Sequence, residues 1–143
     1  MSTAREIVER WWAAFEAGDD EALATMSTPD CEIIMPGLGT IGRQTLLGQV
    51  FPAYKAAFPD LHHETVDAIE HGDRVVVRLR TTMTHTGPFA TPRGEVAATG
   101  RSVVLDSADV VTVSDGRITS WHAYFDQMSL LGQLGLLPQP AGA

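Results

Sequence analysis

The sequence contains 143 residues, which is enough for one domain with a sizeable core and too few for two. Hydrophobic residues make up 44% of the chain and charged residues 20%, so we expect it to fold without disulfides or metals. Eighteen acidic residues against ten basic ones give a net charge of −8, which argues against nucleic acid or an anionic membrane as a partner.

The single cysteine, Cys31, cannot form an internal disulfide or a thiolate metal site. The N-terminal stretch MSTAREIVERWW carries charges every few residues and lacks the apolar region of a signal peptide. The chain also has no run of about 20 apolar residues that would cross a membrane. We therefore expect a cytoplasmic protein.

The first part of the chain is predicted to be mainly helical. Apolar residues recur at three-to-four spacing from Ile7 to Phe15, and Ser2 or Thr3 can cap this helix. A short helix over 21–26, a strand over 31–35 and a glycine-containing loop over 36–42 are expected next. A third helix over 43–57 should be kinked or interrupted by Pro52.

After Pro59 the apolar period changes from helical to alternating. Strands are predicted over 61–71, 74–85, 101–113 and 117–126, with a mobile loop over 86–100. Helical spacing returns over 127–137, and 138–143 is expected to be a frayed tail. The chain is therefore predicted to be one domain over 1–143, with an ordered core at about 3–137.

Helices followed by a run of strands are typical of an α+β fold, in which the helices cover one face of a single sheet. We expect N-terminal helices packed on a strongly curved antiparallel sheet. This arrangement would form a cone with an internal pocket between helix aromatics and strand residues.

Familiar catalytic motifs are missing from the sequence: it has no phosphate loop, nucleophile elbow or zinc-binding helix motif. The five histidines show no metal-ligand spacing, so we expect neither a metal nor an organic cofactor. The remaining candidates for a functional site are polar residues inside apolar strands. Burying such a residue costs free energy unless it has a hydrogen-bond partner or binds a ligand.

The last predicted strand carries His122, Tyr124 and Asp126 on one face. Trp121, Ala123 and Phe125 lie on the other. If the polar face lines the pocket, desolvation would raise the pKa of Asp126 and suit it to remove a proton from a weakly acidic C–H. The alternative is an exposed strand-end Asp126 and a His122 bonded to a backbone carbonyl.

The preceding strand places Asp106 and Asp109 on opposite faces, so at most one of them can face the pocket. Asp109 lies deeper in the apolar run and is the better candidate for a buried acid. Alternatively, it is a structural carboxylate that accepts hydrogen bonds from Arg78 or Arg80 across the sheet.

Other candidates come from strand ends and helix faces. His85 ends a strand next to Gly87, where it either meets ligand at the pocket mouth or lies in solvent. The other histidines before it, His62, His63 and His71, are interpreted as surface residues. The candidate pocket lining, which ordinary core packing would also explain, is Trp12, Phe15, Met35, Tyr54 and Phe58, joined by Arg78, Asp109 and Tyr124.

An ordered set of short motifs resembles the SnoaL-like polyketide cyclases, or ester cyclases. This family has the cone-shaped fold of ketosteroid isomerase, also called nuclear transport factor 2-like. The matching motifs, strongest between Phe58 and Gly135, are F-P-D-L-H at 58–62, V-V-V-R at 75–78, T-H-T-G at 84–87, D-G-R-I at 115–118, W at 121, F-D at 125–126 and Q-L-G at 133–135.

The resemblance implies a curved antiparallel sheet over three helices, association at least as a dimer, and a hydrophobic pocket without metal or cofactor. Some relatives close a ring of an aromatic polyketide by aldol condensation, with a pocket Asp as acid/base. Asp126 matches W-x-x-x-F-D and takes that role here, and His85 matches the T-H-T-G histidine. His122 is added by its position beside Asp126, and His122, His85 or Arg78 would stabilise the oxyanion.

Two features depart from the family pattern at the predicted pocket mouth, and both allow a different substrate. Met83 stands where relatives tend to carry Gly, and the loop over 88–101 is longer and more polar than expected.

The residues and the resemblance together suggest three functions, in order of preference. The first is a cofactor-independent cyclase that acts on a polyketide-like or other apolar carbonyl compound. The second is an epoxide hydrolase or isomerase, which needs Asp109, Asp126 and Arg78 to converge. The third is a non-catalytic protein that binds a lipophilic small molecule.

Overall fold

The computed structural model describes residues 3–137, and helix α1 (Ala4–Ala17) opens the fold. Its start is capped by Thr3, whose Oγ1 accepts a hydrogen bond from the Glu6 amide at 3.1 Å. Its end is set by Gly18, whose φ of 70° is the left-handed conformation that glycine adopts without steric cost. A short helix, α2 (Asp20–Thr25), follows at once.

The predicted third helix is divided into three parts. These are α3 (Arg43–Thr45), a π-helical turn η1 (Leu46–Val50) and α4 (Phe51–Ala57). Pro52 lies in the first turn of α4, directly after the π-helical turn. The helical hydrogen-bond pattern is therefore interrupted next to the proline, as predicted.

Six strands form the main sheet, in the order β2-β1-β8-β7-β4-β3. Their bounds are β1 Ser27–Met35, β2 Gly39–Gly42, β3 His62–His71, β4 Arg74–Thr84, β7 Ser102–Ser114 and β8 Arg117–Phe125. Most neighbours are antiparallel, but β1 and β8 are parallel. The prediction of a wholly antiparallel sheet was wrong at this pair, since strands this far apart in sequence are not joined by a hairpin.

Two segments that we expected to be loops contain strands. Residues 39–42 form β2, which pairs with the end of β1. The segment 86–100 holds a small hairpin of β5 (Phe89–Thr91) and β6 (Gly94–Val96). The last helix, α5 (Gln127–Gln133), is shorter than its apolar pattern predicted. The predicted tail over 138–143 lies outside the described residues.

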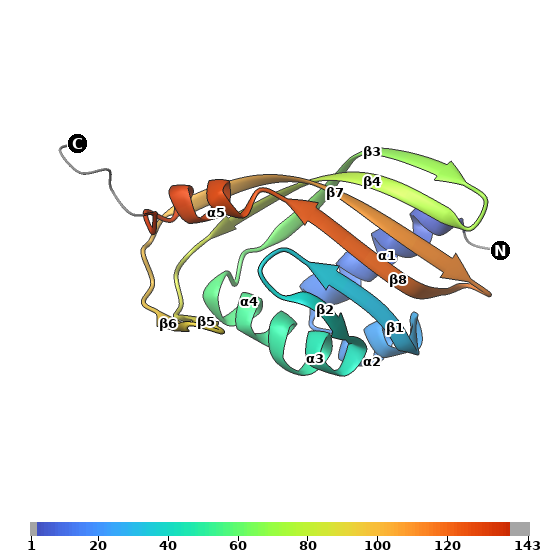
Figure 1. Cartoon of the computed structure of the whole chain (residues 1–143), viewed down its shortest axis with the longest axis horizontal. Coiled ribbons are helices and arrows are strands. Elements are labelled where there is room, and N and C mark those ends of the chain that lie inside the picture. The colour runs from blue at the N-terminus through green and yellow to red at the C-terminus, as the bar shows by residue number, and fades with distance from the viewer. Residues whose placement is uncertain (1–2, 138–143) are drawn as a thin grey trace.

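The sheet curves over the helices, and α1 to α4 lie on its inner side (Figure 1). Buried side chains from α1, β4, β7 and β8 form the main core, in which the Trp11 and Trp121 rings lie 5.8 Å apart. A second buried cluster around Phe58 packs against Leu130 and Leu134 from the segment that follows β8. The predicted α+β class, with helices before a large curved sheet, is confirmed, and the sheet stays open. No helix within 3–137 has the length and apolarity to span a membrane.

Candidate functional site

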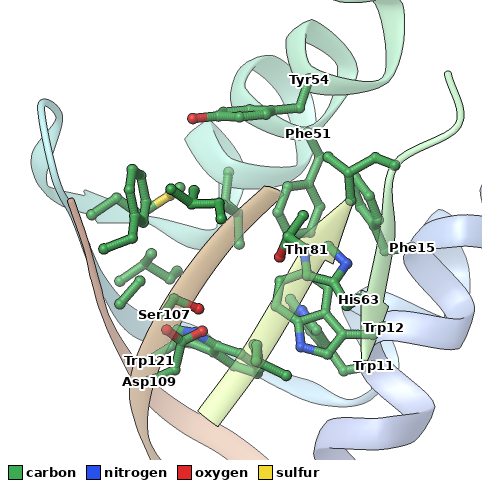
Figure 2. A pocket seen from close by; sticks show the side chains of 18 of the residues that line it. Trp11, Trp12, Phe15, Phe51, Tyr54, His63, Thr81, Ser107, Asp109 and Trp121 are labelled. Atoms are coloured by element: carbon green, nitrogen blue, oxygen red, sulfur yellow. The ribbon is translucent and has the colours of Figure 1, made fainter. Parts of the chain in front are cut away.

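A cavity of about 100 Å³ lies between α1, the segment from η1 to α4 and the inner face of the sheet. Aromatic rings provide much of its wall: Trp11, Trp12, Phe15, Phe51, Tyr54 and Trp121 (Figure 2). Its polar lining side chains are few: His63, Thr81, Ser107 and Asp109, together with the Tyr54 hydroxyl. An apolar wall with a small number of polar groups is typical of a small-molecule site.

Asp109 is the only carboxylate among the described residues that line this inner cavity. It projects inward from β7 and is 3% exposed. Trp121 Nε1 donates a hydrogen bond to its Oδ2 at 2.9 Å, while Oδ1 has no hydrogen-bond partner within 3–137. Desolvation raises the pKa of Asp109 to about 7, and interactions with the Trp121 indole, the Tyr124 main chain and the Ser107 hydroxyl act in the opposite direction. This carboxyl can therefore both take and return a proton near neutral pH.

Trp12 and His63 form a stacked pair in the cavity wall. Their ring centroids are 3.6 Å apart and their planes are inclined by 12°. The main-chain N–H of His63 donates to Glu16 Oε1 at 2.8 Å, which ties β3 to α1. Burial lowers the pKa of His63 to about 3, so its ring is neutral at physiological pH. Within the described chain, Trp12 Nε1 and His63 Nδ1 are buried without a hydrogen-bond partner.

Tyr54 and Met35 complete the predicted part of the lining. Burial raises the pKa of Tyr54 to about 12, so its hydroxyl stays protonated and can donate a hydrogen bond. Met35, at the end of β1, supplies a flexible thioether. Of the residues predicted to bind substrate, Trp12, Phe15, Met35, Tyr54 and Asp109 line the cavity.

The polar face of β8 lies outside the cavity, which corrects the prediction for Asp126, His122 and Tyr124. Asp126 is exposed and caps α5, with its Oδ1 accepting from the Ser129 amide at 3.1 Å. His122 Nε2 lies 2.9 Å from Glu32 Oε1, and Tyr124 is 55% exposed. Strand alternation was correct, but the helices require the apolar face of β8 to point inward.

Arg78 also lies on the outer face of the sheet, away from Asp109. Arg80 is paired on that face with Asp106 at 3.6 Å, so neither arginine bonds to Asp109 as the structural alternative required. Arg78 and Asp126 line a shallow pocket on this outer face, but Asp109 lines the inner cavity, so the set of three needed for the hydrolytic alternative does not converge.

His85 and Phe58 belong to the second buried cluster and do not line the cavity. His85 is fully buried, which contradicts both a pocket-mouth and a solvent position. Its Nδ1 accepts from the Thr99 amide at 3.2 Å and lies 3.0 Å from Thr99 Oγ1. His85 is also bonded through its main chain, since its N–H donates to Arg101 O at 2.9 Å and its carbonyl accepts from the Gly100 N–H at 2.8 Å. Together these contacts tie the end of β4 to the segment before β7.

Sequence reasoning missed several cavity residues, among them Phe51, Thr81, Ser107 and Trp121, and it took His63 for a surface histidine. Its side chain is 10% exposed. The available signal was its spacing from Leu61 and Thr65, because alternate residues share a strand face and Leu61 marks the inner one. Within 3–137, no group of three or more His, Cys, Asp or Glu side chains is arranged to hold a metal ion.

Comparison with known proteins identifies the family. Residues 8–121 match the family described as SnoaL-like domain. The chain belongs to this SnoaL-like family. No curated protein matches the SnoaL-like sequence.

Solved structures share this SnoaL-like fold over nearly the whole chain. IdmH of Streptomyces antibioticus, a candidate polyketide cyclase, is 29% identical, with 94% of this chain and 99% of IdmH covered and a TM-score of 0.80. AclR of Streptomyces galilaeus, a candidate hydroxylase, is 23% identical, with 96% and 84% covered and a TM-score of 0.79. A candidate SnoaL-like polyketide cyclase from Jannaschia sp. CCS1 is 21% identical, with 93% and 92% covered and a TM-score of 0.79.

Proposed function

We propose that this protein is a cofactor-independent enzyme that performs enolate chemistry on an apolar carbonyl compound, as a polyketide cyclase does. The observation that carries the proposal is Asp109, a buried carboxyl with one unbonded oxygen in an aromatic cavity. The candidate cyclases among the solved relatives support the same reaction class.

In the proposed reaction, Asp109 moves one proton and no redox change occurs. Its carboxylate takes a proton from the carbon next to a carbonyl, the C–H electron pair forms the C=C bond of an enolate, and the C=O π pair moves onto the oxygen. The enolate carbon then attacks a second carbonyl of the same molecule, which forms the C–C bond and leaves an alkoxide. The proton on Asp109 passes to this alkoxide, so the carboxylate is regenerated.

The pKa of Asp109 suits this proton transfer. A carboxyl with a pKa of about 7 is a stronger base than an ordinary aspartate, and about half of it is ionised at neutral pH. A positioned acid/base group of this kind contributes about 10²–10⁴ in rate. The aromatic wall supplies the other requirement, because it holds a flat substrate in one conformation and keeps bulk water away from the enolate.

The experiment uses 2-tetralone, a bicyclic ketone with an acidic CH₂ next to its carbonyl. In D₂O, proton NMR should show the protein accelerating exchange of these hydrogens, and Asp109→Asn should reduce the catalysed rate by about 10²–10⁴. Equal exchange rates in the two proteins would rule out Asp109 as the base. If both proteins bind 2-tetralone but neither accelerates exchange, the non-catalytic binding function replaces the enzyme.

We also propose that the protein works in the cytoplasm as a homodimer. The single thiol of Cys31, which is buried and free, supports that compartment. The exposed apolar side chains on the outer face of the sheet support association.

A further inference from the structure

We infer that Trp12 donates a hydrogen bond from its indole Nε1–H to the carbonyl oxygen of the substrate, and that His63 is the positioning residue for this indole. The inference rests on the proposed function and narrows the substrate class. The ring that enters the cavity belongs to a neutral ketone, with its oxygen at Trp12 and its acidic C–H at Asp109.

The indole N–H of Trp12 is enclosed and unused by the protein. Its Nε1 is buried and meets no hydrogen-bond acceptor within 3–137. The equivalent nitrogen of Trp121 lies in the same cavity but is bonded to Asp109. An indole N–H can only donate, and leaving a donor buried without an acceptor costs free energy. A ligand that brings an oxygen to Trp12 removes this cost.

The Trp12 ring is held from both sides. His63 stacks on it at 3.6 Å, and Trp121 packs against it edge-on, with centroids 5.1 Å apart and planes at 80°. His63 is itself fixed, because its main-chain N–H is bonded to Glu16 of α1. A donor held in this way needs little reorganisation when charge develops on the oxygen of an enolate.

Trp121 contacts both Trp12 and Asp109. Its ring packs edge-on against the Trp12 ring, and its Nε1 donates a hydrogen bond to Asp109. Figure 2 shows Asp109 and Trp12 on different sides of the cavity that both residues line. In the complex that we infer, a single planar ring presents its carbonyl oxygen to Trp12 and its adjacent C–H to Asp109.

The charges around the cavity select a neutral substrate. No Lys or Arg belongs to the described residues that line it, and His63 is uncharged at neutral pH. Asp109 is partly ionised there. A carboxylate ligand would be desolvated without a cation to pair with, so ketones should bind in preference to acids of the same shape.

The test is an NMR titration of the full chain labelled with ¹⁵N, in which each tryptophan gives one indole N–H signal. The probe is 2-tetralone, and tetralin, which has the same rings without oxygen, is the matched control ligand. The Trp12 signal, assigned from Trp12→Phe, should move downfield with 2-tetralone and not with tetralin. The indoles of Trp11 and Trp121 also line the cavity, so changes in their signals show that each probe has entered it.

The affinities for 2-tetralone and tetralin, measured in the same titration, distinguish Trp12 as the hydrogen-bond donor from His63 as the positioning residue. Trp12→Phe should weaken 2-tetralone binding about 5- to 10-fold, and tetralin binding less than about 2-fold, because both probes lose the same ring contacts and only 2-tetralone loses a hydrogen bond. His63→Ala should weaken ketone binding as Trp12→Phe does, and His63→Phe should restore it by replacing the stacked ring. The ketone should also bind more tightly than 2-naphthoate.

Equal losses for 2-tetralone and tetralin in Trp12→Phe, or an unmoved Trp12 signal in saturated protein, would overturn the inference. Tighter binding of 2-naphthoate would overturn the neutral-substrate part. These outcomes leave the proposed function standing if Asp109→Asn still abolishes deuterium exchange. Conversely, unchanged exchange in Asp109→Asn with the predicted Trp12 shift would remove the proposed function and keep the carbonyl site.

Discussion

The surroundings of two aspartates in this chain shift their pKa values in opposite directions. Asp60 is exposed and accepts two 2.7 Å hydrogen bonds from Thr84, one from its hydroxyl and one from its amide, which lower the pKa of Asp60. Desolvation by burial raises the pKa of Asp109 to about 7, although one of its oxygens accepts a hydrogen bond from Trp121. Burial without full pairing makes Asp109 the residue prepared for proton transfer.

The raised pKa of Asp109 predicts that the free energy of unfolding falls as the pH rises from about 4 to 7 and stays lower above that range. The native state keeps a proton on Asp109 up to about pH 7, whereas the unfolded chain loses it near 3.8, so stability falls as pH rises between these values. Asp109→Asn removes this penalty and should raise the free energy of unfolding at pH 8 by on the order of 2–4 kcal/mol.

Urea unfolding of both proteins at pH 4 and pH 8 measures this effect. The difference between Asp109→Asn and the natural chain should be small at pH 4 and large at pH 8. His63 has the opposite pH dependence, because its pKa is lowered, but it is present in both proteins and cancels in the comparison. A difference independent of pH would mean that Asp109 titrates normally.

At the scale of elements, Asp126 at the end of β8 has a structural role, unlike Asp109 in the cavity. Asp126 starts α5 by accepting from the Ser129 amide. Asp126→Ala should therefore cost about 0.5–2 kcal/mol of stability through the lost cap, while 2-tetralone exchange is retained. Asp126→Asn, which can still cap the helix, is the matched control and should be close to the natural chain in both measurements. Loss of exchange in Asp126→Ala at a temperature where it is folded would return the catalytic role to Asp126.

Periodicity in the sequence was sufficient to predict most elements. The bounds of α1, β3, β4, β7 and β8 agree with the predicted ranges to within a few residues. Short glycine-containing segments were not recognisable, because β2 and the β5–β6 hairpin have too few residues to show alternation.

The sequence could not show which face of β8 points inward. Alternation separates Trp121 from His122 but does not say which of them meets the helices. Tertiary packing decides it, since the aromatic residues of α1 need an apolar partner and Trp121 provides one. The inner face of the sheet, set by this packing, also carries His63 and Asp109, so both side chains line the cavity.

At the scale of the whole molecule, the sheet has two unlike faces. Helices α1 to α4 cover the inner face, as Figure 1 shows, and the cavity lies between the two layers. The outer face carries a row of apolar residues across paired strands, Ile69, Val76 and Val110, which ends at His122 of β8. The exposed Tyr124 lies two residues further along β8, on the same face. This face is the surface that we assign to the proposed homodimer.

Light scattering tests this assignment. The natural chain should have twice the 15.4 kDa mass of one chain, and the double variant Ile69→Glu/Tyr124→Glu should be monomeric, because charges would be buried at the interface. Met128→Glu is the control, since Met128 is 67% exposed on α5 and lies outside that row. A monomeric natural chain, or a double variant that stays dimeric, would contradict the assignment.

The most direct measurement is the titration of the Asp109 carboxyl itself, by ¹³C NMR of its side chain, with the signal assigned from its loss in Asp109→Asn. The account predicts an apparent pKa near 7, and a higher pKa in Trp121→Phe, where the hydrogen bond that favours the carboxylate is gone. A titration near the ordinary value of 3.8 would contradict it, because a carboxyl that is fully ionised and solvated at neutral pH is too weak a base for the proposed proton transfer.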